Sequence, residues 1–387
     1  MGGAVCGFLR RLTRAGSHFL QGLTISDGHF PCCLTLPDGL GLKLSAAAAA
    51  VFCVLLSGCA QLGQTTHTAA GLQAIEEKSY EEALTQFEQA LEAGEPAKGV
   101  YRGQGIALMG QLDYEGAAQA FTQSLASGSG VPGETDFDVN FYLAACFVKL
   151  GQPDEAKKAY DAILALRPRE AAAYELRGAV EASQGSFEAA DDDFRAAIAL
   201  EPTNYDRMIE MMETMSRYGQ KEMGQAYLSE ALTAHGEGMS NYDKGRLSYY
   251  LEDYDTARAC LEKARSDSDY QATTLLGKTY EALGDYNYAL SVYQAFLSGD
   301  QSHPEIYNQM GLCQMAMGSY QDALNSFQTG MKLPDNAALQ SLSFNEIVAY
   351  EHLGDFRKAA VLMETYLENY PDDEKAQRED VFLGTRG

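Results

Sequence analysis

A repeating pattern of about 34 residues constrains this chain more than any other feature of its sequence. A small residue recurs with a large apolar residue four positions after it, and neighbouring copies lie 32 to 39 residues apart. Residues four apart share one face of an α-helix, so each copy predicts a helix with an apolar face. A period of this length indicates one small helical unit stacked many times. The nine small residues are Ala83, Ala117, Ala156, Ala190, Gly224, Ala257, Ala289, Ala323 and Ala359.

Several copies are interrupted by glycine, then Asp or Ser, then an aromatic residue, as in Gly284-Asp285-Tyr286 and Gly318-Ser319-Tyr320. Gly185-Ser186-Phe187 and Gly354-Asp355-Phe356 follow the same order. Glycine accepts the left-handed conformation at the end of a helix, and Asp or Ser can cap the next helix. Each unit is therefore predicted to be a helical hairpin.

The fifth copy departs from the pattern at two positions. It carries Met212 where most copies have Gly or Ala, and Gly224 where the other eight have Ala. If these positions face each other, the large residue on the first helix is compensated by the small one on the second. Met208, Met211, Met212 and Met215 have helical spacing, which predicts core positions.

This pattern resembles the tetratricopeptide repeat (TPR), and residues 275–297 carry most of the family's positions. The resemblance implies an all-α fold, a right-handed superhelical solenoid of about nine TPR helical hairpins over residues 64–373. Residues 374–387 include apolar positions on a polar segment, and we expect a short C-terminal capping helix there.

The N-terminal segment has the features of an export signal. Residues 44–56 read LSAAAAAVFCVLL after Lys43, too short for the roughly 20 residues of a membrane-spanning helix. The following Leu56-Ser57-Gly58-Cys59 resembles a bacterial lipobox, which implies lipidation of Cys59 and removal of residues 1–58. Residues 59–63 would then form a lipid-anchored tether. A simple cleaved signal or an ordinary anchor helix is the alternative.

Residues 1–41 show neither helical nor strand periodicity, and a lipoprotein signal usually begins only a few residues before its lysine. We interpret residues 42–58 as the signal peptide and residues 1–41 as lying upstream of the true translation start.

Charge and motif content narrow the function. The formal charge of −25 repels phosphate backbones, so we expect no nucleic-acid partner. The sequence contains no nucleophile elbow, zinc-protease, nucleotide-binding or dinucleotide motif, and the repeats leave no room for a catalytic domain. We therefore expect neither enzymatic activity nor a cofactor. Cys146 and Cys313 follow small helical positions, which predicts buried, unreactive thiols.

The resemblance also implies partner binding through a concave face lined by the first helix of each hairpin. The candidate partner-binding residues in hairpins five to seven combine three cations with three tyrosines, a set suited to a peptide that bears carboxylates or aromatic groups. They are Arg217, Tyr242, Arg246, Tyr249, Tyr250 and Lys278. Asp206, Glu213 and Glu281 would neutralise much of this positive charge, so a solvated helix face is the alternative. Other residues expected on this face include Glu213, Glu281, Asn308, Leu312, Met315 and Glu351.

We accordingly expect a non-enzymatic scaffold, anchored by lipid to the bacterial cell membrane or outer membrane, that holds protein or peptide partners at the cell envelope. The alternative is capture of a small envelope ligand, a glycan or peptidoglycan fragment, on the tyrosine-lined surface.

Overall fold

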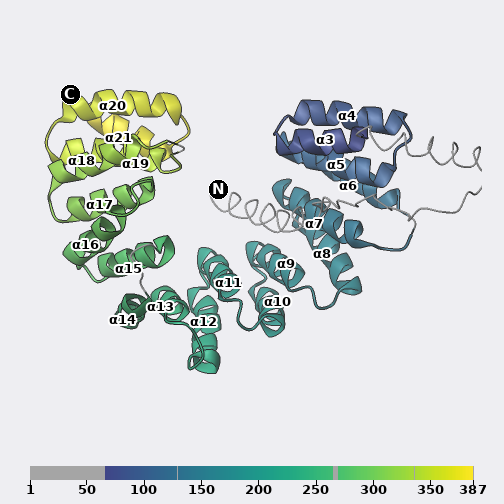
Figure 1. Ribbon diagram of the computed structural model, residues 1–387, viewed down its shortest axis with the longest axis horizontal. Coiled ribbons are helices and arrows are strands. Elements are labelled where there is room, and N and C mark those ends of the chain that lie inside the picture. The colour runs from purple at the N-terminus through teal and green to yellow at the C-terminus, as the bar shows by residue number, and fades with distance from the viewer. Residues whose placement is uncertain (1–65, 129, 265–268, 335, 387) are drawn as a thin grey trace, which may run out of the picture. The chain divides into compact units, whose positions relative to one another are not determined.

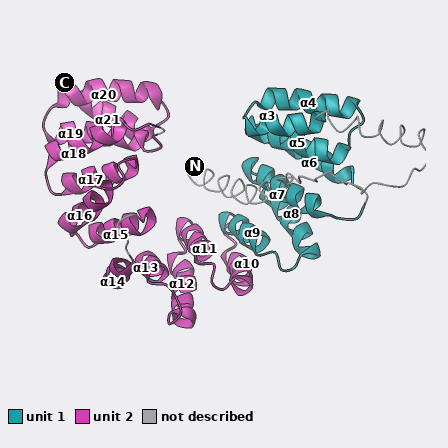
Figure 2. Cartoon of the chain, in the orientation of Figure 1, with its two compact units in different colours: residues 1–184 teal, residues 185–387 magenta. Residues whose placement is uncertain are grey.

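The computed structural model describes residues 66–128, 130–264, 269–334 and 336–386. In these ranges it contains nineteen α-helices and no strand, which confirms the all-α class (Figure 1). The chain divides into two compact units, residues 1–184 and 185–387 (Figure 2).

The helices of the first unit follow one another with short connections. They are α3 (His67–Glu76), α4 (Tyr80–Glu92), α5 (Ala97–Gly110), α6 (Tyr114–Ala126), α7 (Glu134–Lys149), α8 (Pro153–Leu166) and α9 (Ala171–Ser183). Consecutive helices pack as hairpins, α3 on α4, α5 on α6 and α7 on α8.

The second unit continues the same alternation. Its helices are α10 (Phe187–Leu200), α11 (Tyr205–Arg217), α12 (Lys221–His235), α13 (Asn241–Tyr250), α14 (Tyr254–Ala264), α15 (Tyr270–Ala282), α16 (Tyr286–Leu297), α17 (Pro304–Ala316), α18 (Tyr320–Met331), α19 (Leu339–His352), α20 (Phe356–Asn369) and α21 (Glu374–Leu383). The hairpins are α11–α12, α13–α14, α15–α16, α17–α18 and α19–α20.

The turn inside the hairpin places one residue in the left-handed conformation. Gly284 has φ 77° and Gly354 has φ 79°, as their position before Asp predicts. Three corners use a residue with a side chain, namely Lys78, Leu112 and Glu252. The corner is therefore set by the packing of the two helices, and glycine is the residue that adopts it with least strain.

The expected side-chain caps after these corners form only in part. Asp355 accepts a hydrogen bond from the Lys358 N–H, whereas Ser186, Ser319 and Asp285 make no capping bond. At the two serines ψ is near 60°, while the serine that does cap, Ser240, has an extended ψ of 154°. Asp285, with a ψ of 58°, likewise makes no capping bond, whereas the carboxylate of Asp355 caps at a ψ of 64°.

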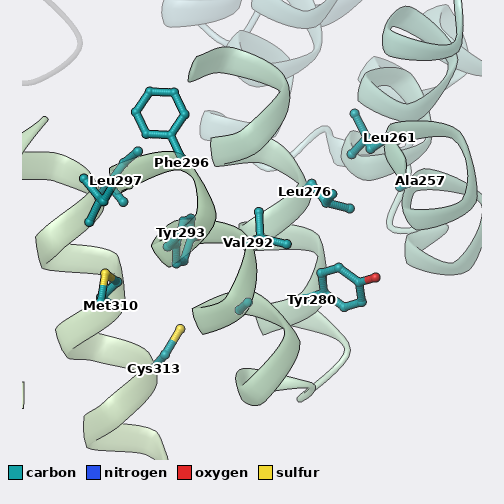
Figure 3. Close-up of a cluster of buried hydrophobic side chains, with 12 residues drawn as sticks. Ala257, Leu261, Leu276, Tyr280, Val292, Tyr293, Phe296, Leu297, Met310 and Cys313 are labelled. Carbon is teal, nitrogen blue, oxygen red and sulfur yellow. The ribbon is translucent and has the colours of Figure 1, made fainter. Parts of the chain in front are cut away.

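The core of each hairpin depends on a small residue facing a large one. In the cluster of Figure 3, Tyr293 of α16 is fully buried among Leu276 of α15 and Met310 of α17. A Cβ atom on Gly277 would lie 2.2 Å from the Tyr293 ring, so only glycine leaves room for the ring. The large residue four positions after the repeated alanine thus packs over the glycine of the preceding helix.

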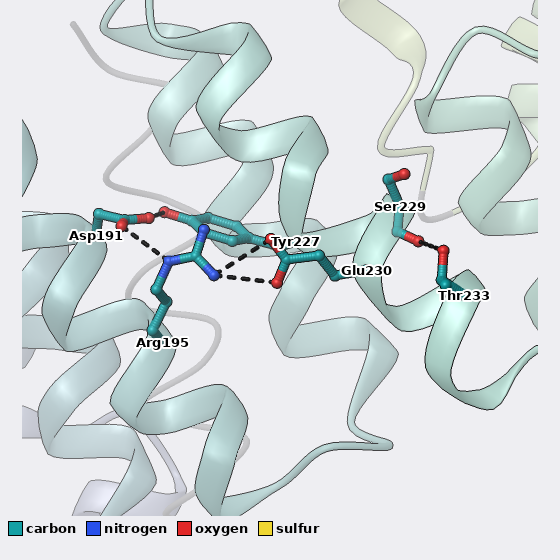
Figure 4. A network of polar contacts seen from close by, with 6 residues as sticks. All are labelled: Asp191, Arg195, Tyr227, Ser229, Glu230 and Thr233. Atoms are coloured by element: carbon teal, nitrogen blue, oxygen red, sulfur yellow. Dashed lines mark hydrogen bonds and ion pairs between the residues drawn. The ribbon is translucent and has the colours of Figure 1, made fainter.

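Polar contacts also join neighbouring hairpins. Tyr227 of α12 donates a hydrogen bond to Asp191 of α10 (2.8 Å), and Arg195 bonds both Asp191 (2.9 Å) and Glu230 (3.0 Å) (Figure 4). The Arg195 guanidinium also lies 5.5 Å from the centre of the Tyr227 ring. The bonds of this network join α10 to α12 and offset the cost of partly burying its polar groups.

The chain ends in α21, which packs on α19 and α20. Ala376 and Leu383 are buried, whereas Val381 is 71% exposed and Phe382 is 39% exposed. Ala376 and Leu383 therefore face the core, Val381 faces solvent, and Phe382 meets the Phe356 ring edge-on at 6.4 Å between ring centres.

Candidate functional site

The six predicted partner-binding residues all lie in the second unit, on three helices. Arg217 is the last residue of α11, Lys278 lies on α15, and Tyr242, Arg246, Tyr249 and Tyr250 lie on α13. The structure divides them into an ion-paired cluster, a groove and a solvent-facing arginine.

The ion-paired cluster is built around Arg246. Its guanidinium bonds Asp206 of α11 at 2.6 Å, lies 3.6 Å from Asp243, and sits 5.3 Å from the centre of the Tyr242 ring. The Arg246 side chain is only 15% exposed. Arg246 therefore holds α13 against α11, and its charge is balanced by two carboxylates before any ligand binds.

The groove lies along α13, α15 and α17 and has a volume of about 510 Å³. We call it the α13–α17 groove. It brings together Tyr249 and Lys278, and adds Glu281 and Leu312, which the sequence also placed on the binding face. Its complete lining is Tyr249, Lys278, Glu281, Ala282, Tyr286, Gln309, Leu312 and Cys313.

A half-buried acid lies beside the lysine of this groove. Burial raises the pKa of Glu281, and the opposing effects of its bonds to Tyr293 and Cys313 and of the Lys278 charge leave it above its usual range. Tyr293 donates to the Glu281 carboxylate at 2.6 Å. Because Tyr293 and Cys313 already bond to the Glu281 carboxylate, Glu281 does not need Lys278 as its hydrogen-bond donor. Lys278 is the cation of the groove lining that can bond to a ligand carboxylate.

Aromatic packing orients the tyrosines at the edge of the groove. The Tyr249 ring meets Tyr250 edge-on (5.5 Å between ring centres) and Tyr254 at 5.7 Å. Burial, and after it the Glu213 carboxylate, raise the pKa of Tyr250 to about 12. Tyr250 thus faces α11, while Tyr249 faces the groove, so the two neighbouring tyrosines serve different contacts.

Arg217 is exposed at the end of α11 and does not line the groove. Tyr286 and Gln309 do line it but were not singled out in the sequence. In the sequence Tyr286 stands out only as the aromatic residue of the Gly284-Asp285-Tyr286 turn. Gln309 lies two residues before the helical glycine, where the sequence shows no recurring residue.

Cys59, the predicted lipidation residue, lies outside the described residues. Among the residues that the structure describes, no helix has the length and apolar character needed to cross a bilayer. In the same ranges no group of three or more His, Cys, Asp or Glu side chains could hold a metal ion.

Comparison with known families identifies the repeat. Family models described as tetratricopeptide repeat match residues 68–132, 146–205, 242–305 and 344–373, together more than half of the chain. The chain therefore belongs to the tetratricopeptide-repeat family, whose fold is typical of protein-interaction scaffolds.

Similarity to individual proteins is lower. A human protein described as FK506-binding protein-like is 32% identical over 108 residues, which are 27% of this chain, and the match spans only 30% of that relative's length. Among solved structures, the chain is similar to yeast Tom70, with 14% identity, 81% of this chain and 88% of that chain covered, and a TM-score of 0.46.

Two further solved structures are similar to parts of the chain. A tetratricopeptide-repeat protein from Parabacteroides merdae ATCC 43184 has 12% identity over 65% of this chain and 98% of its own, with a TM-score of 0.43. YrrB, described as a TPR protein with an unusual peptide-binding site, has 20% identity over 48% of this chain and 90% of its own, with a TM-score of 0.37.

Proposed function

We propose that this protein is a non-enzymatic scaffold, lipid-anchored through Cys59 at the bacterial cell envelope, that holds a protein or peptide partner in the α13–α17 groove. The observation that carries the proposal is the groove itself, where residues from three successive first helices line one space of about 510 Å³. Tetratricopeptide-repeat proteins typically bind proteins or peptides, and this space is large enough for a few side chains of an extended segment.

The groove chemistry favours a peptide that presents a carboxylate near an apolar side chain. Lys278 supplies a positive charge, Gln309 supplies an amide, and Leu312 is 39% exposed. Capture of a sugar is less favoured, because glycans stack on open aromatic faces. The Arg246 guanidinium covers the Tyr242 ring, and Tyr249 packs against Tyr250 and Tyr254.

A photo-reactive amino acid at position 312 of the full chain, introduced in the native host, tests the proposal. We expect it to crosslink one protein or peptide, and the same residue at Tyr288 of α16 to give no such product. Tyr288 is the matched control because it is 62% exposed and does not line the groove.

The need for the positive charge of Lys278 in partner binding is tested by crosslinking in the same cells. Lys278→Gln should reduce the crosslinked product about tenfold or more, as expected from the loss of a charge-assisted bond. Lys263→Gln, which removes an exposed lysine from α14, should leave the product unchanged. Equal products from positions 312 and 288, or equal losses from both lysine variants, would show that the groove is not the binding site.

A further inference from the structure

Two carboxyl groups meet where the C-terminal helix α21 packs on α19. Glu351 of α19 and Glu379 of α21 are both half-buried and within interaction distance. Oε1 of Glu351 is buried and has no hydrogen-bond partner in the described ranges. Two ionised carboxylates have no proton to share, so this contact is favourable only when one of them is protonated.

The basic side chains near this contact pack on aromatic rings or are exposed to solvent. The neighbouring His352 ring stacks on Tyr320 of α18 (4.8 Å between ring centres). From α21, the Lys375 ammonium lies over the Phe344 ring. Arg357 and Lys358 begin α20, Arg378 precedes Glu379 on α21, and all three are exposed.

The C-terminal Arg386 does not balance the acid pair either. Its guanidinium lies 4.7 Å from the Phe382 ring centre and 5.5 Å from that of Phe356. Across the elements packed on Glu351, Glu379 is the charged group that acts on it.

Burial, and after it the Glu379 charge, raise the pKa of Glu351 to about 7. When α21 moves away, the Glu379 charge is removed and Glu351 becomes more exposed, so its pKa falls toward the ordinary value of 4.5. The docked helix therefore binds a proton more tightly than the released one. Below about pH 4.5 Glu351 is protonated in both states, so its charge does not oppose docking. Between about pH 4.5 and pH 7 the released state loses this proton first, and docking of α21 weakens. Above about pH 7 Glu351 is ionised in both states, and docking weakens no further.

The remaining attachment of α21 is small. The helix has ten residues, of which Ala376 and Leu383 are buried. Its N-terminus is held by Asp373, which accepts a hydrogen bond from Tyr366 of α20 at 2.7 Å. A terminal helix that is held by two buried side chains and a few aromatic contacts opens at lower free energy than the inner helices, so a change in the charge of one pair shifts its docking.

We propose that the Glu351–Glu379 pair is a pH-sensitive latch, which docks α21 tightly at mildly acidic pH and loosens it at neutral and higher pH. Release of α21 uncovers the apolar end of α19 and α20, where Ile347, Met363 and Tyr366 are buried. The latch is independent of the partner site proposed above, since neither glutamate lines the α13–α17 groove.

Hydrogen exchange of the full chain, followed by mass spectrometry and corrected for the intrinsic pH dependence of exchange, tests the latch. We expect the protection of residues 374–383 to fall up to about tenfold between pH 6 and pH 8, the change that a pKa of about 7 in the docked state and 4.5 in the released state gives. Glu351→Gln should abolish this change, and Glu379→Gln should reduce it. Glu374→Gln, which removes an exposed charge from the same helix, should retain it.

The α19 and α20 amides of the same samples give an internal reference. Equal protection of residues 374–383 at both pH values in the unmodified chain would overturn the proposal. So would a pH dependence that persists in both Glu351→Gln and Glu379→Gln.

Discussion

A Cβ atom on Gly224 would lie 2.9 Å from both the Cα atom and the carbonyl oxygen of Met212. The Met212 Cγ would be 3.2 Å away. The predicted pairing of a large residue on α11 with a small one on α12 is therefore confirmed. The close approach involves the Met212 backbone as well as its side chain, so α11 and α12 meet more tightly than a compensation of side-chain volumes requires.

Gly224→Ala should lower the free energy of unfolding by about 1–3 kcal/mol, because the new methyl group overlaps backbone atoms that cannot rotate away. Urea or thermal unfolding measures this change. Adding Met212→Ala should recover only part of the loss, since it removes Cγ and leaves the Cα and carbonyl contacts in place. Full recovery in the double variant would mean that the side chain alone limits the space.

Gly99 is the matched control for this substitution. It lies in α5, and a Cβ atom there would meet nothing within 4 Å. Gly99→Ala should stabilise the chain by about 0.5–1 kcal/mol through helix propensity alone. Destabilisation by Gly99→Ala would show that alanine is disfavoured for a reason other than the approach of α11 to α12.

The three cysteines of the described residues should differ in reactivity. Burial raises the pKa of the Cys146 thiol to about 12, and burial with the nearby Glu281 raises that of Cys313. Cys260 is partly exposed on α14. Alkylation of the native chain at pH 8, mapped by mass spectrometry, should label Cys260 at least tenfold faster than Cys146 and Cys313, because the thiolate is the reacting form. Equal rates in the native chain would contradict the described packing, and all three should react alike in urea.

Sequence periodicity predicts the helices and much of the core correctly, because the spacing of apolar residues along a helix decides which of them are buried. Met208, Met211, Met212 and Met215 are all 5% exposed or less, as their spacing predicts. The local Gly-Asp and Gly-Ser turns are likewise recognisable, since the left-handed corner depends on adjacent residues.

Contacts between different hairpins are harder to predict. The sequence predicts Arg246 as a ligand-binding cation and Asp206 only as one of three acids that reduce the charge of the site. The structure pairs the two directly, 40 residues apart, once α11 and α13 have packed. Tyr249 and Tyr250 are adjacent in sequence yet face different helices. Such pairings depend on helix rotation and side-chain conformers, which a repeat pattern does not specify.

Lipidation is tested at Cys59. The thiol is the only group of this residue that can carry a thioether-linked lipid, so Cys59→Ala should abolish incorporation of a fatty-acid analogue in a bacterial host. The signal region should also remain uncleaved, because the lipoprotein peptidase acts after acylation. A Cys59→Ala protein that still incorporates the analogue would contradict the lipobox interpretation.

Substitutions of Arg246 and Lys278 should differ in their effect on stability, because Arg246 joins two helices and Lys278 lines the groove. Arg246→Gln removes the bond to Asp206 across α11 and α13 and leaves the Tyr242 ring uncovered, so the free energy of unfolding should fall by about 1–3 kcal/mol. Lys278→Gln should change it by less than about 0.5 kcal/mol, because Lys278 lines an open groove. Equilibrium unfolding in urea measures both changes.

Because Asp206 is 77% exposed, added salt should narrow the difference in stability between the unmodified chain and Arg246→Gln. An unchanged stability in Arg246→Gln would contradict the role in packing α13 on α11 that we assign to Arg246.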